Sequence, residues 1–156
     1  MPVKLILLLS LLAYSIIVSQ SFMYILSLKH AQVNLTAESF IEVRKLIDEG
    51  MRSRFTYVVY TALVLSLLLV IATIKTPGSL LFITSVIAFI ALCIDTLLTV
   101  KGNMPINAII NGWTADNLPA NWTEYRAKWF RFLEYRQVAN ITGFLSLLVG
   151  AVFGSK

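Results

Sequence analysis

The chain has one cysteine and one histidine, and each scarcity limits the chemistry available to it. Cys93 cannot form a disulfide within the chain, and a zinc or iron–sulfur cluster needs several thiolates. With His30 alone, a histidine-rich metal site and a haem held by two histidines are excluded within one chain. Phosphate-binding loops, dinucleotide fingerprints and nucleophile motifs are also missing. The sequence therefore predicts neither a metal nor a cofactor.

Charge is scarce as well, at 13% of residues against about 25% in soluble domains, while 58% of the residues are hydrophobic. Stretches of about 20 apolar residues cross a bilayer, and backbone polar groups in lipid must be satisfied within the segment. We therefore predict an all-α integral membrane protein, a single domain over residues 1–156 that forms an up-down-up-down four-helix bundle. The expected spans are residues 5–28, 55–74, 79–100 and 137–153.

The net charge of +5 suits membrane head groups better than nucleic acid, because Lys and Arg flank the apolar stretches. Membrane lipid is thus an expected partner and nucleic acid is not. Five cations follow the first span, five follow the third, and three lie at the opposite side. The positive-inside rule then places the two large loops in the cytoplasm and both termini outside, and we expect a bacterial inner membrane.

Two connecting segments carry structure of their own. Thr36 can cap a short amphipathic helix that Gly50 would end, lying along the membrane interface or packing as a solvated loop helix. On that helix Arg44 and Asp48 are expected to be wet. Residues 101–121 contain prolines, glycines and five asparagines, which favour an irregular but ordered loop with one or two short turns. A long fourth helix should run from about Trp122 to the last span.

Asp95 is the one charged residue within the apolar stretches. A charge facing lipid costs about 2.5–3.5 kcal/mol on insertion scales, so a partner is expected, and Arg136 is the best candidate. The pair could simply fix the helix register. It could also form the floor of a polar pocket at the cytoplasmic mouth, lined by Gln20 and Tyr24, with Asn140 on the same helix face as Arg136.

A second polar cluster lies near the start of the fourth helix. Its tryptophans, Trp113, Trp122 and Trp129, are typical of an aromatic belt at the head groups. Asn103 and Asn107 flank a proline and could either order the loop or present amides to a ligand. His30 is either a solvated interfacial imidazole or a catalytic group.

The spacing of these residues resembles the anthrone oxygenase-like family. The matching elements are Asn103-x-Pro105-x-Asn107, then Trp113, then Pro119-x-x-Trp122-x-x-x-Arg126-x-x-Trp129 and Arg136. Its members are small four-helix membrane proteins, mostly a domain of unknown function, and its name comes from fungal members linked to anthrone oxidation without metal or flavin. The resemblance covers the last third of the chain. It implies functional roles for Asn103, Asn107, Trp122, Arg126, Trp129 and Arg136.

Three functions remain open. The first is a binding or structural module whose pocket holds a small aromatic or lipid-like ligand, with the ligand-binding candidates Gln20, Tyr24, Asn103, Asn107, Trp113, Trp122, Trp129 and Asn140. The second is a cofactor-independent oxygenase acting on an anthrone- or quinone-like substrate. In that enzyme His30 or Asp95 would act as base and Arg126 or Arg136 would stabilise the anion. A transporter ranks third, since four helices would need a homo-oligomer to form a path.

Overall fold

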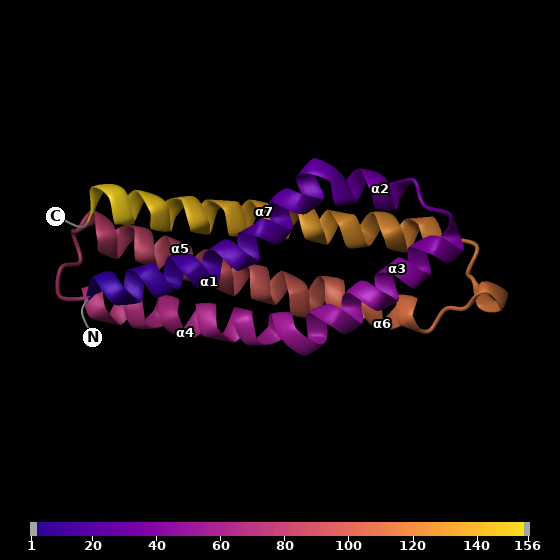
Figure 1. The fold of residues 1–156 in the computed structure, drawn as a ribbon, viewed down its shortest axis with the longest axis horizontal. Coiled ribbons are helices and arrows are strands. Elements are labelled where there is room, and N and C mark those ends of the chain that lie inside the picture. The colour runs from indigo at the N-terminus through magenta and orange to yellow at the C-terminus, as the bar shows by residue number, and fades with distance from the viewer. Residues whose placement is uncertain (1–2, 155–156) are drawn as a thin grey trace.

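In the computed structural model, which describes residues 3–154, there are four long helices, and each runs antiparallel to the two that pack beside it (Figure 1). Three of them are interrupted by one π-helical turn. In chain order the elements are α1 (Val3–Met23), η1 (Tyr24–Leu28), α2 (Lys29–Val33), α3 (Ala37–Gly50), η2 (Met51–Phe55), α4 (Thr56–Thr73), α5 (Leu80–Leu98), η3 (Thr99–Asn103), α6 (Met104–Asn111), η4 (Ala115–Asn117) and α7 (Trp122–Phe153). All four long helices are apolar enough to cross a membrane, which confirms the predicted integral membrane bundle.

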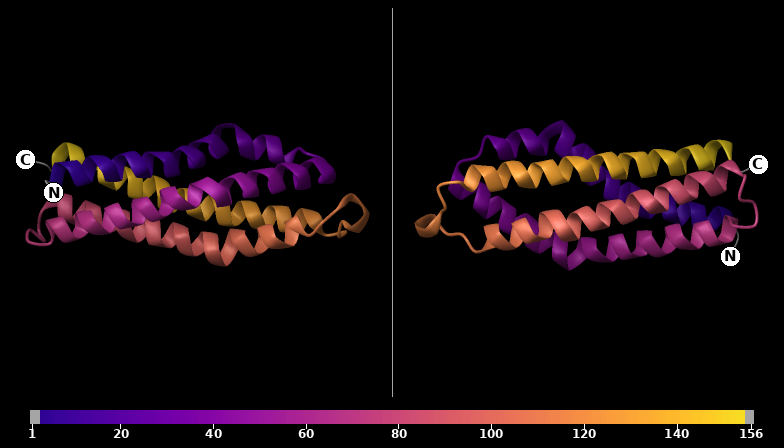
Figure 2. Two further views of the ribbon diagram at one scale, coloured as in Figure 1. Left: turned by 60° about the horizontal axis from the view of Figure 1, so that its bottom comes forward. Right: turned by 180° about the vertical axis from the view of Figure 1, so that it is seen from behind.

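Short-range hydrogen bonds explain where the helices begin. The Thr36 hydroxyl accepts a hydrogen bond from the Ser39 amide at 3.4 Å, which caps α3 as predicted. The Ser79 hydroxyl caps α5 in the same way, through the Phe82 amide at 3.2 Å. Between α4 and α5 the Thr76 amide bonds the Thr73 carbonyl, which closes the predicted tight turn. The second and third long helices are therefore a hairpin (Figure 2).

The amphipathic helix neither lies along the interface nor ends at Gly50. It continues through η2 into α4 as one helix from Ala37 to Thr73, so this prediction was wrong. A glycine inside a helix costs only about 1 kcal/mol. Phe40 and Ile41, both buried against α6 and the start of α7, outweigh that cost. The amphipathic helix α3 is thus the polar half of one of the long helices of the bundle. Each such continuous helix is called a rod below.

The predicted loop of residues 101–121 is also mostly helical. Helix α5 continues through η3 into α6 as far as Asn111, and only residues 112–121 are irregular, around the short turn η4. Pro105 does not break the helix because it stands in the first turn of α6, directly after the π-helical turn η3.

The three π-helical turns lie where the apolar half of the molecule meets the polar half. Each adds a residue to a helical turn, and the bends in the α1–α2 and α3–α4 rods are visible near the middle of the molecule (Figure 1). One core, around Tyr14, Leu69 and Leu147, fills the apolar half. A second, around Phe40 and Trp129, fills the polar half. The interior of the bundle therefore consists of two separate cores, which meet at the level of the π-helical turns.

Helix α7 packs closely on α1 and α5 through small residues. A methyl group added at Gly143 would lie 2.7 Å from Tyr14 Cζ and 2.9 Å from Ala91 Cβ. We therefore predict that Gly143→Ala lowers the free energy of unfolding by about 1–3 kcal/mol, because overpacking displaces neighbouring helices. Thermal unfolding in detergent measures the change.

Gly50→Ala is the matched control, since a methyl group there meets no described atom within 4 Å. It should leave the protein as stable or more stable by up to about 1 kcal/mol. Equal losses in the two variants would contradict the close packing at Gly143.

Candidate functional site

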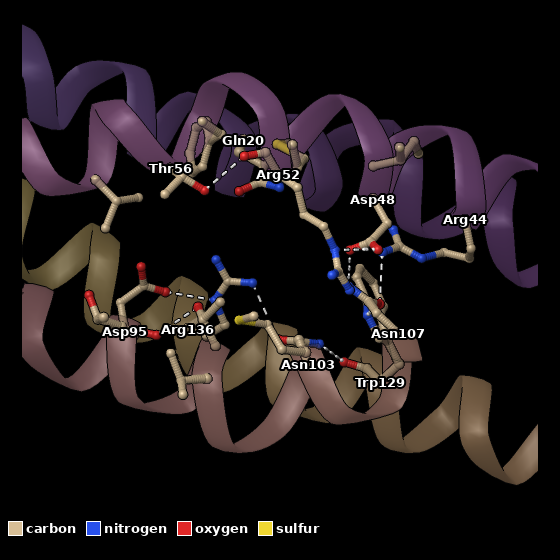
Figure 3. A pocket seen from close by; sticks show the side chains of 18 of the residues that line it. Gln20, Arg44, Asp48, Arg52, Thr56, Asp95, Asn103, Asn107, Trp129 and Arg136 are labelled. Atoms are coloured by element: carbon tan, nitrogen blue, oxygen red, sulfur yellow. Dashed lines mark hydrogen bonds and ion pairs between the residues drawn. The ribbon is translucent and has the colours of Figure 1, made fainter. Parts of the chain in front are cut away.

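A cavity of about 280 Å³ lies at the level of η2 and η3. The helix of residues 37–73 forms one wall, the helix of residues 80–111 forms the other, and Trp129 and Arg136 of α7 close the back (Figure 3). The full lining is Gln20, Arg44, Ile47, Asp48, Met51, Arg52, Phe55, Thr56, Val59, Tyr60, Asp95, Thr96, Thr99, Val100, Asn103, Met104, Asn107, Trp129 and Arg136.

The end of the cavity nearest the apolar half is built on the predicted ion pair. Arg136 Nε donates to Asp95 Oδ1 at 2.7 Å, and the two residues are 8% and 1% exposed. Arg136 Nη1 also donates to Asn103 Oδ1 at 3.3 Å, and Asn103 Nδ2 donates to the Trp129 carbonyl at 3.0 Å. The charge of Asp95 is thereby kept away from lipid, and α5 is tied to α7.

Asn107 organises the opposite end. Its Oδ1 accepts hydrogen bonds from Trp129 Nε1 at 2.8 Å and from Arg44 Nη2 at 3.2 Å. Its Nδ2 donates to Asp48 Oδ1 at 2.7 Å, and Asn111 donates to the other oxygen of Asp48 at 2.8 Å. One amide therefore connects three of the long helices.

Arg44 is buried in this network. Its guanidinium lies 3.8 Å from the centre of the Trp129 ring and donates to the Tyr24 hydroxyl at 3.2 Å. Arg44 and Asp48 are only 3% and 6% exposed, so the prediction that both are wet was wrong. Their four-residue spacing from Phe40 puts all three on one helix face, which is the signal in the sequence that could have placed them inside.

Six of the predicted site residues line the cavity together. These are Gln20, Asp95, Asn103, Asn107, Trp129 and Arg136. Arg44, Asp48 and Arg52 were missed as site residues, and all three come from the polar end of the rod that was expected to lie on the membrane surface.

The remaining candidates lie elsewhere. Tyr24 is buried behind Arg44, and Trp113 packs edge-on against Tyr125. Arg126 lies over Trp122 at 4.5 Å, at the far polar end, and donates to the Leu35 carbonyl. Further predicted residues outside the lining are Asn140, which is buried in α7, and His30, which is exposed on α2.

The mouth of the cavity opens sideways between the two walls. Tyr60 is 62% exposed on one rim, and Val100 and Met104 are 48% and 41% exposed on the other. Arg52 and Thr56 continue the first rim towards the polar end and are exposed as well. The rim thus starts beside apolar residues and ends beside the Arg52 guanidinium.

The carboxylates of the lining are both engaged. Asp95 accepts from Arg136, while Asp48 accepts from Asn107, Asn111 and Arg52, the last at 2.8 Å. A carboxylate that already accepts hydrogen bonds from a guanidinium or an amide has fewer free lone pairs with which to contact a ligand. No group of three or more metal-ligating side chains exists among residues 3–154. This arrangement favours recognition of a molecule over proton abstraction from it.

The Asp95–Arg136 pair generates a stability prediction. Asp95→Ala leaves a buried guanidinium without its counter-charge, so the free energy of unfolding should fall by about 3–5 kcal/mol. The double variant Asp95→Ala with Arg136→Met should lose less than the sum of the two single changes. Thermal unfolding in detergent measures each effect.

Glu134→Gln supplies the control on the same helix. It breaks the ion pair with Lys29, in which the Lys29 and Glu134 side chains are 45% and 47% exposed. The free energy of unfolding should therefore fall by no more than about 1 kcal/mol. Additive losses from the Asp95 and Arg136 changes would show that the pair contributes no coupling.

No known family model, curated protein or solved structure matches this chain. The resemblance to the anthrone oxygenase-like family therefore stays a prediction. Of its motif residues, Asn103, Asn107, Trp129 and Arg136 line the cavity, whereas Trp122 and Arg126 do not.

Proposed function

We propose that the protein binds one small amphiphilic molecule, aromatic or lipid-like, that enters the cavity from the membrane. The observation that carries this proposal is the position of the mouth, which extends from Tyr60 in the apolar span to Arg52 at the polar end. A molecule with an apolar body and a polar head adopts the same orientation at a membrane interface. It can therefore reach the cavity without leaving the bilayer.

The walls support the same conclusion. Phe55, Val59 and Ile47 supply apolar surface from one rod, while Asn103 and Arg136 supply polar atoms from the other side. Small-molecule sites are mostly apolar, with a few polar groups that fix the orientation of the ligand. The cavity combines both features in a volume of about 280 Å³.

The membrane orientation belongs to this proposal. The polar half carries ten cations, against Lys4 and Lys75 at the opposite end, where both chain ends emerge (Figure 1); Lys156 lies outside the described residues. The positive-inside rule then puts the polar half in the cytoplasm and the termini outside, in a bacterial inner membrane. The mouth would face the cytoplasmic leaflet.

A cofactor-independent oxygenase is the second candidate. Four motif residues of the anthrone oxygenase-like pattern line the cavity, which favours a shared pocket chemistry. Proton abstraction would fall to Asp95, because His30 is exposed on α2 and Asp48 is held by three donors. Since Asp95 is itself bound to Arg136, binding ranks above catalysis.

Filling the cavity tests the proposed function. Val59→Trp should block the pocket, so a molecule that co-purifies with the native protein should decrease at least about tenfold, as expected when binding weakens by about 1.4 kcal/mol. Mass spectrometry of protein purified gently from its own membrane measures the amount retained. A quinone- or anthrone-like molecule would favour the oxygenase, and a lipid would favour the binding module.

Val64→Trp is the matched control on the same helix, because Val64 is 57% exposed and does not line the cavity. It should retain the molecule at the level of the unaltered protein. Equal retention in the Val59 and Val64 variants would place the ligand elsewhere and contradict the proposal.

A further inference from the structure

The charges that line the cavity do not cancel. Three guanidinium groups, those of Arg44, Arg52 and Arg136, face two carboxylates, those of Asp48 and Asp95. Assigning each group its ordinary charge leaves one positive charge in excess. Because much of the lining is apolar and the site is partly buried, this charge is screened less than it would be in water.

The excess charge can be assigned to Arg44. Arg136 is paired directly with Asp95 at 2.7 Å, and Arg52 is paired directly with Asp48 at 2.8 Å. The hydrogen-bond partners of Arg44 are neutral, namely the Tyr24 hydroxyl and the Asn107 amide oxygen. Arg44 has no hydrogen bond to a carboxylate among the described residues; Asp48 acts on it through space and is already bonded to Arg52 and Asn107.

Arg44 also retains an unused donor. The residue is 3% exposed, and its Nε is buried without a hydrogen-bond partner in the described structure. The other acids of α3, Glu38, Glu42 and Glu49, are exposed and do not line the cavity. Asp48 is thus a single carboxylate shared by two guanidinium groups, those of Arg44 and Arg52, so a further anion beside Arg44 would be stabilised.

Arg52, at the rim of the cavity, is a second cation, and its exposed guanidinium can change position to meet a ligand. The Arg52 side chain is 53% exposed and is held to Asp48 through Nε alone. Its terminal nitrogens are thus available to a head group at the mouth, while its aliphatic stem stays against the wall.

From this arrangement we infer that the ligand is an amphiphilic oxyanion with one negative charge. The inference rests on the proposed function and specifies its ligand class. The oxyanion lies beside Arg44, within reach of the terminal nitrogens of Arg52 and on the side away from Asp48, and the apolar body extends along Phe55 and Val59 towards the mouth. A bilayer lipid with an anionic head group and a free amphiphile such as a carboxylate or phenolate share this chemistry.

A pair of ligands that differ only in charge tests the inference on the unaltered protein. In phosphatidylcholine nanodiscs, dodecanesulfonate should bind at least about tenfold more tightly than dodecanol, because a charge-assisted hydrogen bond exceeds a neutral one. The same preference should hold for 2-naphthalenesulfonate over 2-naphthalenemethanol. Equilibrium binding of radiolabelled ligands gives the four affinities.

Two variants locate the charge, and a third is the control. Arg44→Gln should reduce sulfonate affinity about tenfold and alcohol affinity less than about twofold. Arg52→Gln, a change at the exposed rim, should reduce sulfonate affinity by a smaller factor. Arg54→Gln removes the same charge from the same helix outside the cavity and should leave the preference intact. A preference unchanged in both the Arg44 and Arg52 variants would overturn the inference.

The outcomes separate the two proposals. Equal affinity for sulfonates and alcohols, both lost in Val59→Trp, would overturn the charge inference and leave the proposed function standing. If none of the four ligands binds saturably, the proposed function itself is contradicted. Displacement of dodecanesulfonate by phosphatidylglycerol in the disc would support the inference and identify a bilayer lipid as the source of the oxyanion.

Discussion

Asp95 and Arg136 hold opposite charges together inside the bundle, among apolar side chains and a few buried amides. Neither charge could face lipid without a cost of several kcal/mol, so α5 and α7 must present these two side chains to each other. That constraint fixes the register of the two helices. It also places Asn103 beside Arg136 and Trp129 beside Asn103, and so determines one end of the cavity.

The π-helical turns let the same helices serve two environments. In the apolar half, close packing around Gly143 joins α7 to α1 and α5. In the polar half, aromatic residues and charged side chains fill a wider space around Asn107. An extra residue in η2 and another in η3 shift the faces of α3 and α6 relative to α4 and α5, since each adds about 100° of rotation. Arg44 and Asn107 thereby turn towards the cavity.

The sequence contained enough information for the four spans, because runs of apolar residues have few alternatives in lipid. It also identified the Asp95–Arg136 pair, since a single charge within the spans demands a partner. It did not reveal that the helices continue past Gly50 and Pro105, which are ordinary helix terminators. Tertiary packing of Phe40 and Ile41 overrides the glycine, and the position of Pro105 in the first turn of α6 makes the proline tolerable. For the same reason Arg44 and Asp48 were misplaced, and His30 was considered for a site that its exposed position does not reach.

The two walls of the cavity are joined covalently only at the Thr73–Ser79 turn, at the opposite end of both rods. From Thr56 to Thr73 the helix is about 27 Å long at 1.5 Å per residue, so this joint lies far from the polar end of the slot. The polar ends of the same two helices are held together by noncovalent contacts, among them the hydrogen bonds from Asn107 and Asn111 to Asp48. One end of the slot is thus closed by a covalent turn and the other by a hydrogen-bonded clasp, so weakening the clasp would widen the slot without breaking the chain.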